Sequence, residues 1–149
     1  AAIYGASDET IAETAGINNM RMAHEVGVMW RTMFREAAEW IKQIQEKGLQ
    51  DGYVTTIQGR KLWLPSEFEE DEGGRRRKAT NFPIQGSAAE MTKDALLVCA
   101  KKGYNLTLQV HDELVIDADI PEEELRELGL EDLAPFRCPI SVKHLERWE

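Results

Sequence analysis

Three consecutive polar residues, His111, Asp112 and Glu113, lie between two short runs in which apolar and polar residues alternate. The runs cover residues 106–110 and 114–117, and a period of two residues predicts β-strands. We therefore expect a hairpin that reverses at the three polar residues. A carboxylate held at the tip of a stiff hairpin suits a metal-ion site for phosphoryl chemistry. An ordinary polar turn explains the same residues equally well.

A basic segment precedes this predicted hairpin in the chain. Residues 75–78 are all Arg or Lys, and Arg60 and Lys61 lie a short distance upstream. The net charge of -9 argues against nucleic acid binding, because Lys and Arg make the contacts to phosphates. The acidic residues, however, concentrate in 67–72 and 117–132. A basic strip on an acidic chain is compatible with DNA held on one face, although most charge runs are solvated loop edges.

The composition indicates one globular domain. A chain of 149 residues with 42% hydrophobic residues can form one core. Neither a membrane-spanning stretch nor a signal segment is present in the sequence, so we expect a cytosolic protein, or one in the host cytoplasm if it is viral. Cys99 and Cys138 have no metal-type spacing, and we expect buried free thiols.

The helices are predicted from caps and from apolar spacing. Ser7 can cap a short helix that ends near Gly16, and a second helical region runs from Asn18 or Asn19 to about Gly48. Its apolar stripe predicts core packing and comprises Val26, Met29, Trp30, Met33, Phe34, Ala37, Trp40, Ile41 and Ile44. Further helices are expected from Pro83 to just before Gly103 and over residues 121–128.

Strands and loops are predicted between these helices. Residues 53–57 and 61–64 are rich in β-branched and aromatic side chains, with a Gln-Gly turn between them, and predict a small hairpin. Residues 66–74 read as a polar loop. A final strand is expected over residues 139–142.

Four segments together resemble one known protein family. They are Tyr4-Gly5 with a helix-forming stretch behind it, residues 52–65, residues 75–90 and residues 109–115. In this order they resemble the C-terminal palm and fingers of the family A DNA polymerases, the DNA polymerase I-like enzymes. Four motifs in order are a more specific signal than any one of them.

The resemblance implies an α+β fold in which helices pack around an antiparallel palm hairpin, a partial polymerase palm and fingers. The whole chain, 1–149, would be one C-terminal palm and fingers fragment. Within it, residues 1–50 would be fingers helices, 51–80 a hairpin with the basic loop, and 81–149 part of the palm. The family has a break between two helices in the first of these parts, often at a proline, and residues 32–36 contain none.

The resemblance also implies the chemistry of the polar triplet. Asp112 matches one of two metal-binding aspartates, Glu113 stands beside it, and His111 would lie near the primer terminus without binding metal. Nucleotidyl transfer in this family uses two divalent ions, and oxygen ligands suit Mg²⁺. The partners implied are primer-template DNA and a dNTP.

Arg77, Asn81 and Gln85 are spaced four residues apart, hence on one face if the segment is helical. The matching residues of the family contact the primer-template near the insertion site. Arg and Gln are donors, and minor-groove acceptors occur in every Watson–Crick pair, so such residues can test pair geometry without reading sequence. Taken alone, the three residues fit a plain polar helix face equally well.

Three other residues match DNA-binding positions of the family. Tyr4 would stack near the templating base, while Arg60 and Lys61 would contact the DNA backbone. The family's other metal-binding aspartate and the cations that grip the triphosphate lie upstream of the position of Tyr4. We therefore expect template-directed DNA synthesis only together with an upstream polymerase segment that carries this aspartate, in a phage-like or cellular enzyme.

Two other functions remain open from the residues. A metal-dependent phosphohydrolase could use His111 and Asp112 as ligands, but such sites need additional histidines, and only His24 and His144 remain. A non-catalytic nucleic-acid-binding module would explain the basic run but would leave the polar triplet without a purpose.

Overall fold

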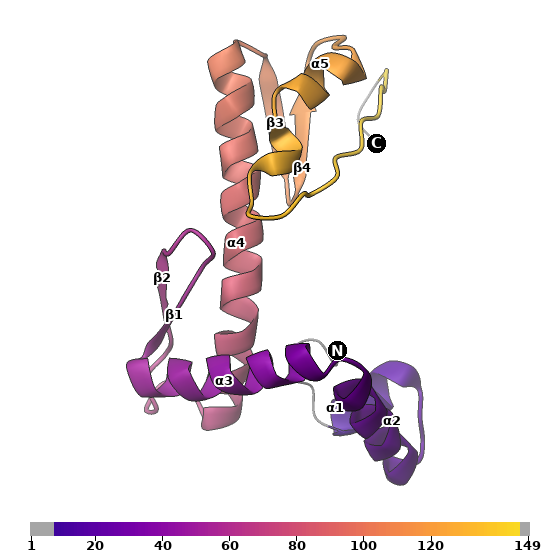
Figure 1. Ribbon diagram of the computed structural model, residues 1–149, viewed down its shortest axis with the longest axis vertical. Helices are drawn as coiled ribbons and strands as arrows, with labels where there is room; N and C mark the ends of the chain where they lie inside the picture. The colour runs from indigo at the N-terminus through magenta and orange to yellow at the C-terminus, as the bar shows by residue number, and fades with distance from the viewer. Residues whose placement is uncertain (1–7, 147–149) are drawn as a thin grey trace. The chain divides into compact units, whose positions relative to one another are not determined.

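The computed structural model describes residues 8–146 of the chain (Figure 1). The chain divides into two compact units, residues 1–86 and 87–149, and each is described by itself. The elements in chain order are α1 (Asp8–Ala15), α2 (Met20–Met33), α3 (Arg35–Asp51), β1 (Tyr53–Thr55), β2 (Lys61–Trp63), α4 (Glu72–Lys102), β3 (Leu106–Val110), β4 (Glu113–Ile116), α5 (Glu122–Glu127) and the 3₁₀ helix η2 (Leu130–Asp132).

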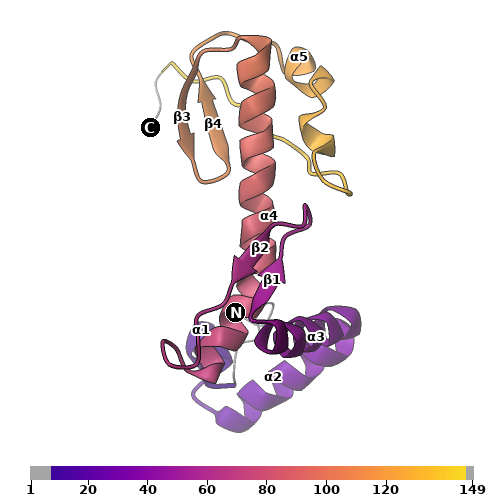
Figure 2. The same ribbon diagram turned by 90° about the vertical axis from the view of Figure 1, so that its left-hand side faces the viewer.

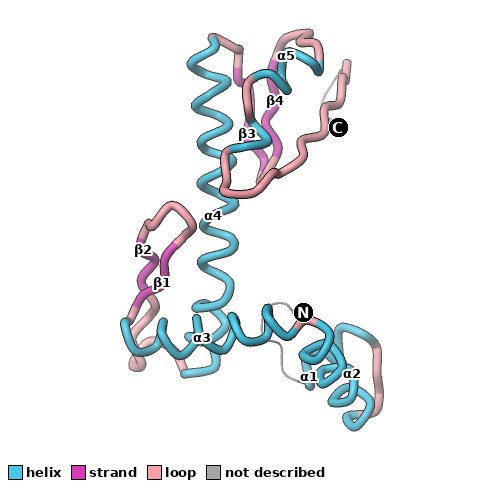
Figure 3. The backbone as a smooth tube through the Cα atoms, in the orientation of Figure 1, coloured by secondary structure: helices cyan, strands magenta, loops and turns pink. Residues whose placement is uncertain are grey.

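Helices alternate with two separate antiparallel sheets of two strands each, β1–β2 and β3–β4 (Figure 3). The α+β prediction is confirmed. None of the helices between residues 8 and 146 is both long and apolar enough to cross a membrane.

Helices α1 and α2 form a small core in the first unit. Ile11 and Ala12 pack against Ala23, with Ile17 and Val26 at the edge. The chain between them reverses where Gly16 adopts a φ of 65° after the last turn of α1, as the sequence predicted. Asn19 then caps α2, because its Oδ1 accepts the Arg21 and Met22 backbone N–H groups at 3.0 and 3.3 Å. The predicted cap Ser7 lies outside the described residues.

The long helical region is two helices, and the break falls at Phe34, which has φ -114° and ψ 53°. The prediction that the apolar stripe is core was wrong for much of its length. Met29, Met33, Phe34 and Trp40 are exposed among the described residues. The stripe identifies an apolar face, but no described element covers this part of it.

A second core joins α3, the β1–β2 hairpin and the first half of α4. Val54, Leu64 and Ala79 are buried together. This hairpin was predicted from the sequence. It pairs Tyr53 with Trp63 and lies beside α4 in Figures 1 and 2. Gly48 of α3 faces this cluster closely enough that an added Cβ would lie 2.9 Å from Val54 Cγ1.

Helix α4 begins earlier than predicted. Residues 75–80 were expected in a basic loop and Pro83 in a first helical turn, whereas the helix starts at Glu72 and Pro83 lies inside it. The physical reason is a cap: Asp71 Oδ1 accepts the backbone N–H of Gly74 at 2.7 Å, and Glu72 pairs with Arg76 one turn on. The basic run is therefore helical.

At its other end α4 stops as predicted, and Gly103 has a φ of 89°. The Gly103 and Tyr104 N–H groups donate to the carbonyls of Ala100 and Cys99, which is the Schellman arrangement. Cys99 is a buried free thiol, and burial raises its pKa, whereas Cys138 is also free but only half-buried.

Polar contacts connect α5 and the C-terminal segment to the rest of the second unit. Tyr104 donates its hydroxyl hydrogen bond to Glu124 of α5 at 2.6 Å, which raises the pKa of Tyr104 to about 12. Glu131 is buried and accepts hydrogen bonds from Arg137 Nε, Arg126 Nη1 and the backbone N–H of Ile140. These bonds, above all those from Arg137, hold the pKa of Glu131 below its ordinary value.

The final strand predicted over residues 139–142 does not form. Residues 137–145 adopt no regular structure, and the β3–β4 sheet has only two strands. The Ile140 N–H, which a strand would use for pairing, is bonded to the Glu131 carboxylate instead. Pro139 has no N–H to offer a ladder at all.

Candidate active-site hairpin

The polar triplet lies at the tip of the β3–β4 hairpin, where the sequence placed it. Val110 pairs with Glu113, so His111 and Asp112 alone form the turn. The Gln109 amide donates a hydrogen bond to the backbone carbonyl of His111 at 3.3 Å. His111 has a φ of 52°, a left-handed conformation that histidine adopts more readily than most residues do. A two-residue turn of this kind fixes where the next side chain, Asp112, projects.

His111, Asp112 and Glu113 are all exposed to solvent. Asp112 has no ion-pair or hydrogen-bond partner among residues 8–146, so its carboxylate oxygens remain available to a ligand. Carboxylate oxygens are the donors that Mg²⁺ prefers, so the type of donor fits. The number of donors does not fit: nowhere in the described part of the chain do three acidic, His or Cys side chains gather as metal ligands.

Each of the other two histidines lies beside an aspartate. His24 Nδ1 lies 2.7 Å from Asp8 Oδ2 on helices α1 and α2. His144 Nδ1 lies 3.4 Å from Asp119 Oδ1, and both of these side chains are exposed. Within the described part of the second unit, His144 is the one further histidine that a hydrolase site built on His111 could use, and it lies beside Asp119.

Arg77, Asn81 and Gln85 lie on α4, at successive helical turns in the first unit. Arg77 and Gln85 are exposed, and Asn81 is half-buried with an Oδ1 atom that has no hydrogen-bond partner in the described residues. Because residues four apart share a face, the three side chains form one polar row. The extension of α4 to Glu72 is what brings Arg77 onto this row.

The two basic residues of the first hairpin are exposed. The Arg60 backbone N–H donates to Thr56 Oγ1 at 3.1 Å, which closes the β1–β2 turn. Lys61 Nζ lies 4.1 Å from the centre of the Tyr53 ring. Tyr4, the remaining predicted DNA-binding residue, lies outside the described residues.

The structure thus forms two groups of predicted site residues. The row on α4 and the basic residues belong to the first unit, whereas the triplet belongs to the second. One feature was missed from the sequence: the exposed aromatic residue Trp63 beside Lys61. The sequence contained one signal for this feature, because Trp63 lies opposite Tyr53 in the predicted hairpin.

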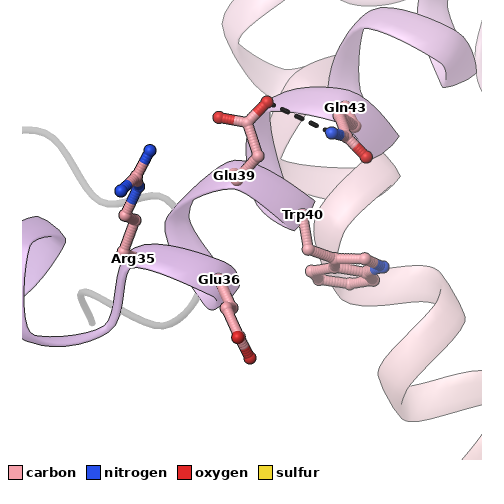
Figure 4. A pocket seen from close by; sticks show the side chains of 5 residues that line it. All are labelled: Arg35, Glu36, Glu39, Trp40 and Gln43. Carbon is pink, nitrogen blue, oxygen red and sulfur yellow. Dashed lines mark hydrogen bonds between the residues drawn. The ribbon is translucent and has the colours of Figure 1, made fainter.

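A shallow depression of about 430 Å³ lies on one face of α3 and contains none of the predicted site residues. Figure 4 shows its lining side chains, which all come from this helix, and the hydrogen bond between Gln43 and Glu39. With a single helix as its wall, it cannot enclose a substrate.

Known proteins match most of this chain. Residues 1–135 match the family described as DNA polymerase family A. The chain is 30% identical to "DNA polymerase I, thermostable" of Thermus filiformis and 31% identical to "DNA polymerase I" of Geobacillus stearothermophilus. Each alignment covers 95% of this chain but only 18% of the relative, so the chain spans about a fifth of their length.

A solved structure agrees with these relatives. It is described as the POL domain of Pol1 from M. smegmatis in complex with DNA primer-template and dNTP. The match has a TM-score of 0.74 and 28% identity, and it covers 90% of this chain and 26% of the other. Since the family match extends over most of the 149 residues, the chain belongs to DNA polymerase family A.

Proposed function

We propose that this chain supplies the palm hairpin and part of the fingers to an enzyme that carries out template-directed DNA synthesis. The reaction joins a dNTP to the 3′-hydroxyl of a primer and releases pyrophosphate. The observation that carries the proposal is Asp112, an exposed carboxylate that has no partner within residues 8–146 and lies at the tip of a two-residue turn, in a chain of this family.

Asp112 would hold one of two divalent ions, with Mg²⁺ as the natural choice for oxygen ligands. Such ions activate the primer hydroxyl and stabilise charge on the triphosphate. Glu113 adds a second carboxylate next to it, while His111 would orient the primer terminus as a hydrogen-bond donor. One or two carboxylates are too few for such a site. We therefore infer that another polymerase segment supplies the second metal aspartate and that this chain is inactive by itself.

The row on α4 would contact the newly formed base pairs. Arg77 and Gln85 are exposed donors that can reach the acceptors common to all Watson–Crick pairs in the minor groove. Asn81 between them would add a third polar group. Arg60 and Lys61 would contact the phosphate backbone, which adds affinity but no sequence information.

The test of the catalytic proposal is Asp112→Asn in the polymerase assembled with its upstream segment. This change keeps the size of the side chain and removes the charge that anchors the ion. Primer extension with Mg²⁺ and four dNTPs should fall by several orders of magnitude, while DNA affinity changes little. The matched control is Asp117→Asn at the base of the same hairpin, where the carboxylate accepts a bond from Asn105 at 3.4 Å. Near-normal extension by the Asp112 variant refutes the role.

A second measurement separates the α4 row from the phosphate contacts. Gln85→Ala and Arg77→Ala should slow single-turnover incorporation and change extension of mismatched termini, at a cost of about 1–3 kcal/mol per lost contact. Arg60→Ala should weaken DNA binding evenly and lower the salt slope by about one. If all three variants changed only salt-dependent affinity, α4 would be a plain basic face and the non-catalytic binding module would be favoured.

A further inference from the structure

The β1–β2 hairpin carries an aromatic and basic surface formed by the exposed residues Lys61 and Trp63 and the half-buried Tyr53. Tyr53 and Trp63 are directly paired across the strands, with ring centres 5.3 Å apart and ring planes tilted by 60°. Trp63 is 68% exposed, which is unusual for the largest apolar side chain. We call these three residues the hairpin platform.

The positive charge of the hairpin platform is the ammonium group of Lys61, which lies close to both aromatic rings. Lys61 Nζ lies 4.1 Å from the centre of the Tyr53 ring and 5.9 Å from that of Trp63. Both distances are within the range of cation–π attraction, so the ammonium group is positioned without a carboxylate partner in the described residues. Asp51, two residues before Tyr53 in the chain, is paired with Lys47 at 2.9 Å. The platform therefore presents a net positive charge beside an open aromatic face.

The hairpin beneath the platform is held firmly. A Cβ at Gly86 of α4 would lie 2.8 Å from Leu62 Cδ1 and 2.9 Å from Thr56 Cγ2, so the hairpin packs directly against the helix backbone. Val54 of β1 and Leu64, which directly follows β2, belong to the buried core. A rigid support lowers the entropy cost of binding, because the platform residues are already in place.

We propose that the hairpin platform binds one unpaired nucleotide of a single-stranded template, with the base stacked on Trp63 and its phosphate on Lys61. An aromatic face beside a cation is how proteins bind single strands, because every base has a π-face and every nucleotide a phosphate. Base pairs inside a duplex are stacked on both sides and offer no such face. The proposal rests on the proposed function, since it makes this ligand the unpaired part of the DNA on which the enzyme works.

The experiment compares two DNA ligands for the purified 149-residue chain. One is a blunt-ended duplex, and the other is the same duplex with a 5′ overhang of unpaired thymidines at one end. Fluorescence anisotropy gives both affinities. We expect the overhang to increase the affinity of the unaltered chain and Trp63→Leu to abolish that gain, a loss of about 10-fold. Duplex affinity should stay unchanged.

Two further variants test the division of roles. Trp63→Phe keeps an aromatic face and should retain most of the gain, whereas Lys61→Gln should lower the salt slope of overhang binding by about 0.7. The matched control is Trp40→Leu on α3, another exposed tryptophan of the same unit, which should change neither affinity. Far-UV circular dichroism checks that each variant keeps its helices.

The outcomes separate this proposal from the polymerase proposal. If the chain binds duplex but gains nothing from the overhang, the platform proposal is wrong and the polymerase proposal stands. If Trp63→Leu weakens binding of both ligands equally, or if Trp40→Leu removes the gain as well, the loss is not specific to stacking on Trp63 and the platform proposal is wrong. If overhang binding depends on Trp63 while Asp112→Asn leaves extension intact in the assembled enzyme, the platform stands and the polymerase mechanism fails. A chain that binds neither ligand refutes the platform.

Discussion

The substitution Gly48→Ala tests whether α3, the β1–β2 hairpin and α4 meet as closely as the structure indicates. The added Cβ would lie 2.9 Å from Val54 Cγ1, 3.2 Å from Ala79 Cβ and 3.4 Å from Leu64 Cδ1. Val54 is β-branched and Ala79 is attached directly to the α4 backbone, so neither atom can rotate away. Both residues are fully buried, so relief requires movement of a strand or a helix.

The change in unfolding free energy caused by Gly48→Ala is the difference between two opposing effects. Overfilling a packed core costs about 1–3 kcal/mol. Alanine in place of glycine within a helix stabilises the helix by up to about 1 kcal/mol. Gly48→Ala should therefore lower the free energy of unfolding by about 0–2 kcal/mol. Gly73→Ala on α4 is the matched control, because its Cβ would meet nothing closer than 3.5 Å, and it should raise this free energy by up to about 1 kcal/mol.

Urea unfolding of the chain, followed by far-UV circular dichroism, measures this contrast. At an m-value of about 2 kcal/mol/M, a contrast of about 2 kcal/mol separates the two midpoints by about 1 M. Adding Val54→Ala to Gly48→Ala removes the closest atom, so the double variant should show favourable coupling between the two sites. Equal stabilisation by Gly48→Ala and Gly73→Ala would refute the close approach of the three elements.

Two other predictions concern buried polar groups. Gln45→Ala removes the donor 3.0 Å from the fully buried Thr80 Oγ1 and should cost about 1–2 kcal/mol of unfolding free energy in the same urea assay. Glu131 has a lowered pKa, chiefly through Arg137, so the folded state binds its proton less tightly than the unfolded state does. Its stabilising contribution should be complete above the ordinary value of 4.5 and should disappear as pH falls below it; urea midpoints measured down to about pH 3 should fall less in Glu131→Gln than in Glu127→Gln.

The two hairpins were predictable because their signals are local. Alternation on either side of His111 and Asp112 fixes both the strands and the turn, since a strand has a period of two and polar residues fill reversals. The same reasoning placed β1 and β2 around a Gln-Gly turn. Gly16 and Gly103 marked two helix ends for the same kind of reason, because each adopts a positive φ.

The start of α4 was missed because two local rules conflict there. Asp71 and Glu72 are good residues for a helix start, but Gly73 and Gly74 follow at once and glycine disfavours helix. Pro83 further suggested a first turn, because proline inside a helix removes one backbone hydrogen bond and clashes with the preceding turn. Capping by Asp71, the Glu72–Arg76 pair and the burial of Ala79 against Val54 and Leu64 all favour the helix in the fold.

The remaining errors concern what lies next to a segment, which no local pattern contains. The stripe on α2 and α3 has the spacing of a core face, yet the sequence does not say which element covers it. Residues 139–142 have the composition of a strand, but a strand forms only when its backbone N–H and C=O groups pair with a neighbouring strand. The backbone N–H of Ile140 donates to the carboxylate of Glu131 instead. The candidate site has the same limit, because the residue types identify Asp112 as a ligand but not the group that completes its metal site.

The residues that stabilise this chain and those proposed to act on DNA are largely different. Asp112, Arg77 and Gln85 are exposed, so their replacement should cost little unfolding free energy, since surface changes stay within about 0.5 kcal/mol. Gly48, by contrast, contacts no proposed ligand and acts only on packing. Lost extension in Asp112→Asn at unchanged stability would therefore indicate chemistry. Lost DNA binding in Gly48→Ala would instead indicate displacement of the β1–β2 hairpin, because that hairpin packs directly on the altered residue.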